Sequence, residues 1–224
     1  MPTVSETRNV SNFSEIALQG YGDLTIEQNP DAPESLVIEA DKDLMSRLTS
    51  EVRDGRLILG FDMPWYDWLG WGLEWLFTTN KSIHYRVSLK QFNGVALSGA
   101  GNLVAGKLQS TGTCKLAVSG AGKLRIAELQ AQSLTTTISG SGDVEIGAGS
   151  AAQHDLRISG SGSVKAAGLQ TAETRVTVSG AGSAEVDARQ TLTVHISGAG
   201  SVRYSGSPVL NQQISGAGSI HQVR

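Results

Sequence analysis

The sequence predicts an all-β protein, a right-handed parallel β-helix (β-solenoid) with coils of about 18–21 residues and an irregular N-terminal part. Three observations predict this fold: a glycine-rich tetrapeptide that recurs at a nearly fixed period, apolar residues at fixed offsets from it, and a charged column that alternates in sign. The handedness is inferred from the general preference for right-handed crossovers and not from a feature of the sequence.

The tetrapeptide Ser-Gly-(Ala/Ser)-Gly is the main repeat of the chain. It begins at Ser98, Ser119, Ser139, Ser159, Ser179, Ser197 and Ser215, with spacings of 21, 20, 20, 20, 18 and 18 residues. A degenerate copy stands at 19–22. Because glycine adopts positive φ and allows close backbone approach, we expect each copy to be a tight turn. No copy continues into the Gly-Lys-Ser/Thr of a phosphate-binding loop.

Aliphatic columns flank each copy of the repeat. One residue before the serine stand Leu97, Val118, Ile138, Ile158, Val178, Ile196 and Ile214, and five residues after it stand Leu103, Leu124, Val144, Val164, Ala184, Val202 and Ile220. Apolar and polar residues alternate around these positions, which is typical of strands with one buried face. A period near 20 favours stacked coils over successive hairpins. We expect about eight to ten coils.

A charged column tests the stacking hypothesis. Six residues after the serine, the chain carries Arg125, Glu145, Lys165, Glu185, Arg203 and His221. In parallel coils about 4.8 Å apart, each charge lies beside an opposite one, and such cross-strand pairs stabilise modestly. The alternation therefore indicates that neighbouring repeats are neighbours in space.

The chain divides into an N-terminal β region (1–90) with a tryptophan-rich insert at 62–79, and a regular repeat region (91–224), which we expect to form one continuous domain. The unit 13–24 resembles the unit 92–103. Between them we expect a strand at 36–40, a short helix or turn at 41–48, a hairpin at 51–59 around Asp-Gly, and a strand at 82–89.

The insert supplies the candidate binding site. The predicted surface or interface patch consists of Trp65, Tyr66, Trp68, Trp71, Trp75 and Phe77, and it includes all four tryptophans. Aromatic side chains are enriched in binding hot spots and at membrane interfaces, which favours a protein, glycan or membrane contact. A flap that covers the flank or end of the solenoid is the alternative, and self-association through the insert is a third. Asp67 and Glu74 without a basic cluster argue against anionic lipid.

Composition excludes several other functions. The net charge is −3, the pI is about 5.8 and no basic run occurs, so we expect no nucleic-acid partner. No apolar run is long enough for a transmembrane segment. Cys114 is the single cysteine, which excludes an internal disulfide and a cysteine zinc cluster, and we expect it to be buried. We predict no cofactor and no metal site.

An enzyme is the alternative class, because some β-helices cleave polysaccharides. Glycosidases need two carboxylates at a defined separation. Glu145 and Glu185 stand two coils apart with Lys165 between them, and their alternation with cations favours a stabilising ladder instead. We expect the pair His154–Asp155 to lie on the surface in a return loop.

The order of several segments resembles a known family. These segments are the tetrapeptides, the opening RNVSNFSEIALQGYGDLTIEQ, the hairpin EVRDGRLIL and the stretch YRVSLKQFNGVALSGAGNL. They are similar to the bacterial putative auto-transporter adhesin, head GIN domain family. The resemblance implies a β-helical, non-catalytic protein with an adhesin-like binding or structural role. It also implies a periplasmic, outer-envelope or secreted location. The polar N-terminus lacks a secretory signal, so a cytoplasmic location stays open.

Overall fold

The computed structural model describes residues 3–62 and 82–223. It is nearly all β, with 77% strand and 2% helix, and it forms a β-solenoid of about six turns. The predicted fold class is confirmed. The number of turns is below the eight to ten expected, because part of the N-terminal region forms antiparallel strands instead of further coils.

Over the described ranges, the elements are strands and one short helix. Their bounds are β1 (Thr3–Arg8), β2 (Glu15–Gly20), β3 (Asp23–Gln28), β4 (Ser35–Asp41), α1 (Lys42–Met45), β5 (Leu48–Arg53), β6 (Arg56–Phe61), β7 (His84–Leu89), β8 (Gly94–Gly99), β9 (Asn102–Gly120), β10 (Lys123–Gly140), β11 (Asp143–Gly160), β12 (Ser163–Gly180), β13 (Ser183–Gly198), β14 (Ser201–Ser205), β15 (Val209–Gly216) and β16 (Ser219–Gln222). The strand, the short helix and the hairpin expected between the first two units are all present.

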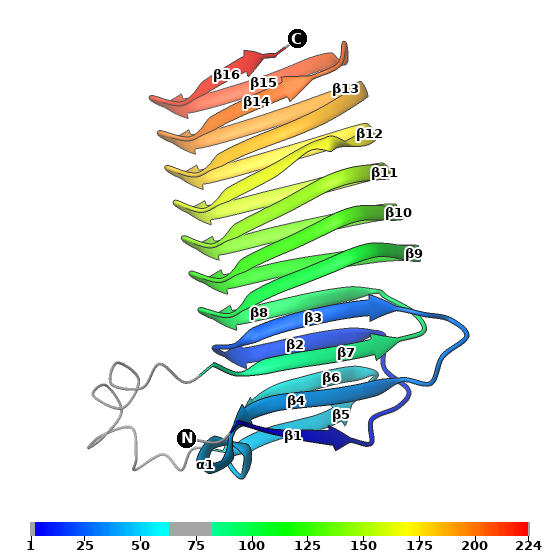
Figure 1. The fold of residues 1–224 in the computed structure, drawn as a ribbon. Coiled ribbons are helices and arrows are strands. Elements are labelled where there is room, and N and C mark those ends of the chain that lie inside the picture. Colours follow the sequence, from blue (N-terminus) through cyan, green and yellow to red (C-terminus); the bar gives the residue numbers. More distant parts are fainter. Residues whose placement is uncertain (1–2, 63–81, 224) are drawn as a thin grey trace, which may run out of the picture.

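Each of the strands β9–β13 is one coil of the solenoid. It leaves a glycine turn, bends at the far side of the stack and returns to the next glycine turn (Figure 1). Consecutive coils pair in parallel, and each tetrapeptide serine lies beside the serine of the next repeat, as with Ser139 and Ser159. The repeat of the sequence is therefore the repeat of the structure.

The glycine turns stack directly on one another. Gly160 has a φ of 122°, and a Cβ built on it would lie 2.4 Å from the carbonyl oxygen of Gly140. The next turn continues the ladder, since the Ala181 amide donates to the Gly160 carbonyl at 2.9 Å. Only glycine fits this position, because a side chain would require both an unfavourable φ and an occupied space.

The aliphatic columns form one core along the stack. The core extends from Phe13 in the first unit to Val202 in the last coils, and Leu108, Leu129 and Leu169 fill it beside the far bend. Cys114 is fully buried as predicted, and burial raises the pKa of its thiol to about 12.

The N-terminal region changes the order of the stack. β2 pairs in parallel with β8 on one side and with β6 on the other, while β3 lies between β9 and β7. The coil formed by β2 and β3, although first in the sequence, therefore lies inside the stack, between the coil of β6 and β7 and that of β8 and β9. Antiparallel strands follow beyond it: β5 on β6, β4 on β7, and β1 on β4. α1 contacts β4 and β1 at this end, and its Leu44 is buried.

Candidate functional site

The tryptophan-rich insert connects β6 to β7, two strands that pair with β2 and β3 of the solenoid. Its six predicted site residues lie outside the described residues, and the structure places only the strands on either side. Leu59 of β6 is beside Leu18, and Tyr85 of β7 is beside Leu24. In the neighbouring coil, Leu18 and Leu24 flank the glycine turn at 19–22. In the sequence, the segment from 62 to 83 therefore stands where that coil has its turn.

Both ends of this segment are held by contacts that the sequence analysis missed. Phe61 stacks on Tyr21, with ring centroids 5.1 Å apart and planes 22° apart. The Asp62 amide donates to the Arg47 carbonyl at 2.8 Å, while the buried Ile83 accepts from the Asp23 amide at 2.8 Å. The aromatic residue in the degenerate motif was the available signal, because Tyr21 replaces the small residue of the other copies.

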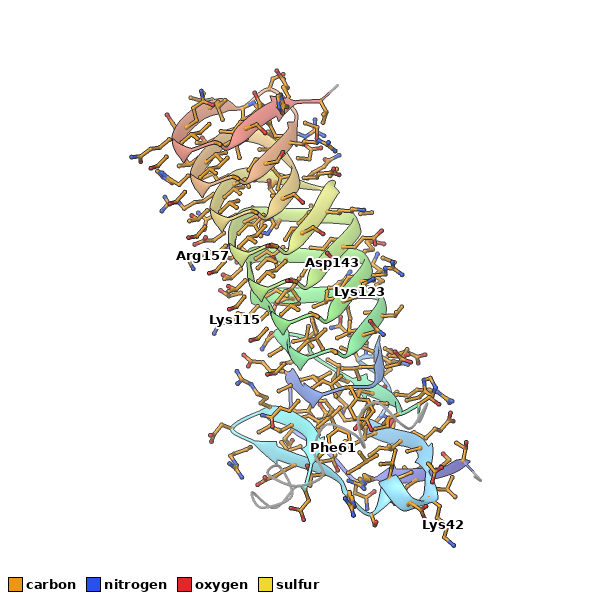
Figure 2. All side chains as sticks on the ribbon, turned by 90° about the vertical axis from the view of Figure 1, so that its left-hand side faces the viewer. Lys42, Phe61, Lys115, Lys123, Asp143 and Arg157 are labelled. Carbon is orange, nitrogen blue, oxygen red and sulfur yellow. The ribbon has the colours of Figure 1, made fainter. Side chains whose placement is uncertain are left out.

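The outer surface has two long faces. We call the outward side chains between each glycine turn and the far bend the leading face, and those between the bend and the next turn the return face. Figure 2 shows Lys123 and Asp143, which belong to the leading face, on one side, and Lys115 and Arg157 of the return face on the other.

The charged column predicted from the sequence lies on the leading face. Its members occupy one register position on consecutive coils, from β10 to β16. Arg125 bonds Glu145 at 3.1 Å, and Arg203 bonds Glu185 at 3.0 Å. The two carboxylates of the enzyme hypothesis therefore each bind an arginine on the outer surface, with Lys165 between them, and a hollow of about 300 Å³ lies at Arg125, Glu145 and Lys165.

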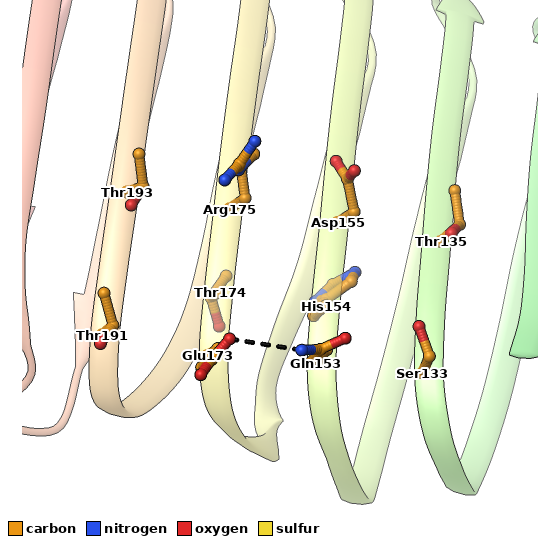
Figure 3. A pocket seen from close by; sticks show the side chains of 10 residues that line it. All are labelled: Ser133, Thr135, Gln153, His154, Asp155, Glu173, Thr174, Arg175, Thr191 and Thr193. Carbon is orange, nitrogen blue, oxygen red and sulfur yellow. Dashed lines mark hydrogen bonds between the residues drawn. The ribbon is translucent and has the colours of Figure 1, made fainter.

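A shallow polar hollow of about 350 Å³ lies on the return face (Figure 3). Its lining comes from four consecutive coils: Ser133, Thr135, Gln153, His154, Asp155, Glu173, Thr174, Arg175, Thr191 and Thr193. Two side-chain interactions involve the lining residues. The Gln153 side chain donates a hydrogen bond to Glu173 at 3.4 Å, and Arg157 forms an ion pair with Asp155 at 2.6 Å. Hydroxyl, amide and carboxylate groups suit hydroxyl-rich ligands. No motif in the sequence indicates this hollow, because it depends on neighbouring coils.

His154 lies in the core and not on the surface as predicted. It was expected on the surface in a return loop, but it lies in β11 with only 2% of its surface exposed. Strand alternation places it in the inward column of Leu134 and Thr174. Its Nε2 is 3.0 Å from the Thr136 hydroxyl, whereas its Nδ1 has no partner. Burial lowers the pKa of His154 to about 4, so the ring is neutral at pH 7.

The histidine belongs to a polar group within the core of the middle coils. The hydroxyls of Thr171 and Thr174 bond each other, and Thr171 also donates to the carbonyl of Asp187 at 2.7 Å. These residues, like His154, are almost fully buried. The group forms hydrogen bonds between coils, and two of its members, His154 and Thr174, also line the hollow on the return face.

Within residues 3–62 and 82–223, no group of three or more His, Cys, Asp or Glu side chains could hold a metal ion. Over the same ranges, no helix is long and apolar enough to cross a membrane.

The fold and the outer faces define a class of protein, a β-solenoid of glycine-turn coils with a capped N-terminal end. The chain belongs to the family described as "Putative auto-transporter adhesin, head GIN domain", whose model matches residues 12–208. The resemblance noted from the sequence is confirmed. A search of curated proteins finds no match.

Solved structures share the fold. A putative adhesin from Bacteroides fragilis superposes with a TM-score of 0.86 at 22% identity, covering 99% of this chain and 97% of that one. A putative lipid binding protein from Parabacteroides distasonis has a TM-score of 0.73 at 22% identity, with the same two coverages. A putative adhesin from Parabacteroides merdae has a TM-score of 0.72 at 21% identity and covers 99% of this chain and 96% of that one.

Proposed function

We propose that this protein is a non-catalytic binding protein of the bacterial cell envelope, with an adhesin-like role, and that the aromatic insert at 62–79 is its contact. One observation carries the proposal. The insert lies in the sequence between Leu59 and Tyr85, whose positions flank a four-residue glycine turn in every regular coil. Phe61 and Ile83, at the two ends of the insert, both contact the solenoid. The solenoid then acts as a rigid support for this contact.

Family membership supports a surface or envelope role, since relatives are named adhesins. One structural neighbour is instead named a lipid binding protein. Two classes of ligand are therefore to be compared for this chain, a glycan and a lipid surface. The acidic residues of the insert and the net charge of −3 favour a glycan over an anionic membrane.

Binding of the 224-residue chain to a glycan array and to phosphatidylcholine or phosphatidylglycerol vesicles tests the proposal. The variant carries Trp65→Ala, Trp68→Ala and Trp75→Ala together. The matched control is Val104→Ala, a change of an exposed apolar side chain on the leading face, outside the hollow of the return face. We expect glycan binding that the triple variant loses by about tenfold or more and the control retains.

Three outcomes would contradict this proposal. Equal glycan binding by the triple variant would remove the insert as the contact. Vesicle binding without glycan binding would replace the glycan by a lipid. Cleavage of a bound polysaccharide that Glu145→Gln abolishes would replace the binding protein by the carbohydrate-active enzyme considered as the alternative.

A further inference from the structure

The hollow on the return face gathers polar side chains at two neighbouring register positions of four coils. The coils β11 and β12 carry long side chains there, which are Gln153, Asp155, Glu173 and Arg175. The coils β10 and β13 carry short hydroxyl side chains at the same positions, which are Ser133, Thr135, Thr191 and Thr193. Short side chains thus stand on both sides of long ones, and the surface encloses about 350 Å³ (Figure 3).

Much of the hydrogen-bonding capacity of this lining is not used within the described part of the chain. Arg175 has no ion-pair partner there, and Asp155, beside it on the preceding coil, pairs with Arg157 instead. The Gln153 amide donates to only one oxygen of Glu173. Guanidinium donors, carboxylate acceptors and hydroxyl groups therefore remain for a ligand.

The inner side of the hollow contains buried polar atoms without a partner. His154 and Thr174 belong to inward columns, are 2% and 3% exposed, and still line the hollow. The Nδ1 of His154 and the Oδ1 of Asp155 are buried and form no hydrogen bond. Buried polar atoms of native proteins are nearly always paired, so each exception requires an explanation. Of the five such atoms in the described residues, two belong to the lining of this one hollow.

The charges of the hollow select the class of ligand. Asp155 pairs with Arg157, and the charges of Glu173 and Arg175 are opposite, so the lining has no excess charge that would hold an ion. The described residues also contain no group of carboxylates and histidines that could bind a metal cation. A neutral molecule with many hydroxyl groups fits best, because each hydroxyl both donates and accepts a hydrogen bond.

We propose that this hollow is a second binding site, which takes a neutral saccharide unit and does not depend on the aromatic insert. The Arg175 guanidinium donates to ligand hydroxyls, and the free oxygen of Glu173 accepts from them. The hydroxyls of Thr135 and Thr193 border the unit on either side. The site is shallow, so its own affinity is low. Together with a first contact on the same rigid support, it increases the apparent affinity for a surface that presents many saccharides.

An NMR titration of the backbone amides with maltotriose, cellotriose and mannotriose tests the site. We expect at least one of these neutral trisaccharides, at millimolar concentration, to shift the amides of Thr135 and Thr193 and to leave those of the leading face unchanged. Arg175→Met and Glu173→Gln should each raise the dissociation constant about tenfold or more, because each removes charge-assisted hydrogen bonds to the ligand. The same spectra show whether each variant keeps the solenoid intact.

Lys115→Met is the matched control for Arg175→Met. Lys115 occupies the same register column on β9, is exposed, and does not line the hollow. This variant should bind like the original chain, and so should the triple tryptophan variant, since the amide shifts report the return face directly. Failure of the insert on the glycan array and failure of this site are therefore separate results.

Four outcomes would overturn the second site. The first is the absence of amide shifts in the hollow with all three trisaccharides. The second is binding that both Arg175→Met and Glu173→Gln retain, or that Lys115→Met weakens equally. Stronger binding of trigalacturonate that is lost at high salt would replace the neutral saccharide by an anion. Loss of the shifts in the triple tryptophan variant would assign the contact to the insert alone.

Discussion

The N-terminal region and the repeat region build the same coil from different sequences. In the repeat region, Ser-Gly-(Ala/Ser)-Gly turns lie on one another and keep the coils in register. In the N-terminal region, β6 and β7 form a coil beneath β2 and β3 without this motif. Leu59 and Tyr85 take the inward positions that aliphatic residues occupy elsewhere. A coil of this solenoid therefore requires apolar residues at the inward positions. The glycine motif is required only where the turns of neighbouring coils lie in close contact.

The glycine turns should account for the largest difference between the two regions. We expect Gly160→Ala to lower the free energy of unfolding by on the order of 4 kcal/mol, from backbone strain and a clash with the coil beneath it. Gly55→Ala is the control in the N-terminal hairpin, where φ is also positive but no atom lies within 4 Å of the added Cβ. It should cost about 1 kcal/mol. Urea unfolding measures both, and equal losses would show that stacking contributes nothing.

The buried histidine should make the middle coils sensitive to acid. The pKa of His154 is about 4 in the folded protein and 6.5 in an unfolded chain. The unfolded state therefore binds a proton first as the pH falls. The contribution of the neutral ring to the free energy of unfolding is fully present above pH 6.5. It decreases by about 3 kcal/mol as the pH falls to about 4.

Unfolding at a series of pH values checks this expectation. His154→Leu should remove the dependence between pH 6.5 and 4, whereas His195→Leu, a change of an exposed histidine on the return face, should leave it. An unchanged slope in His154→Leu would assign the dependence to other groups.

The N-terminal cap should tolerate truncation better than the interior of the stack. Leu44 in α1 and Leu156 in β11 are 1% and 0% exposed. We expect Leu44→Ala to cost about 2 kcal/mol and Leu156→Ala about 4 kcal/mol, because the end of the stack can close around a cavity more easily. Hydrogen exchange should show faster opening of β1, β4 and β5 in Leu44→Ala only. Faster exchange throughout the solenoid would indicate one cooperative unit.

The charged column should have the smallest effect. Arg125 and Glu145 are 64% and 51% exposed, so solvent screens their attraction. We expect Glu145→Gln to cost about 0.5 kcal/mol. Glu145→Lys should cost about 1 kcal/mol, since it places three cations on adjacent coils. Both losses should shrink in 1 M salt. A loss that persists in salt would contradict an electrostatic origin.

The fold was predictable from the sequence wherever residues repeat at a fixed period. The motif spacing predicted the parallel coils and their register, and the charged column then confirmed which coils are neighbours. The hairpin around Asp-Gly was predictable because its turn chemistry is local. His154 was misplaced because its own neighbours are polar, although its column, with Cys114 and Leu134, is buried. Comparison along the stack, and not along the chain, identifies such a residue.

The sequence by itself determined the coil, its glycine turns, its apolar columns and the family, because each is repeated at a fixed period and periodic signals reinforce one another. Only the tertiary structure decided that the first coil lies inside the stack, that β6 and β7 close beneath it, and that the hollow on the return face joins four coils. These features depend on pairings between residues far apart in the chain. Hydrogen bonding and burial select such pairings, and no local pattern encodes them.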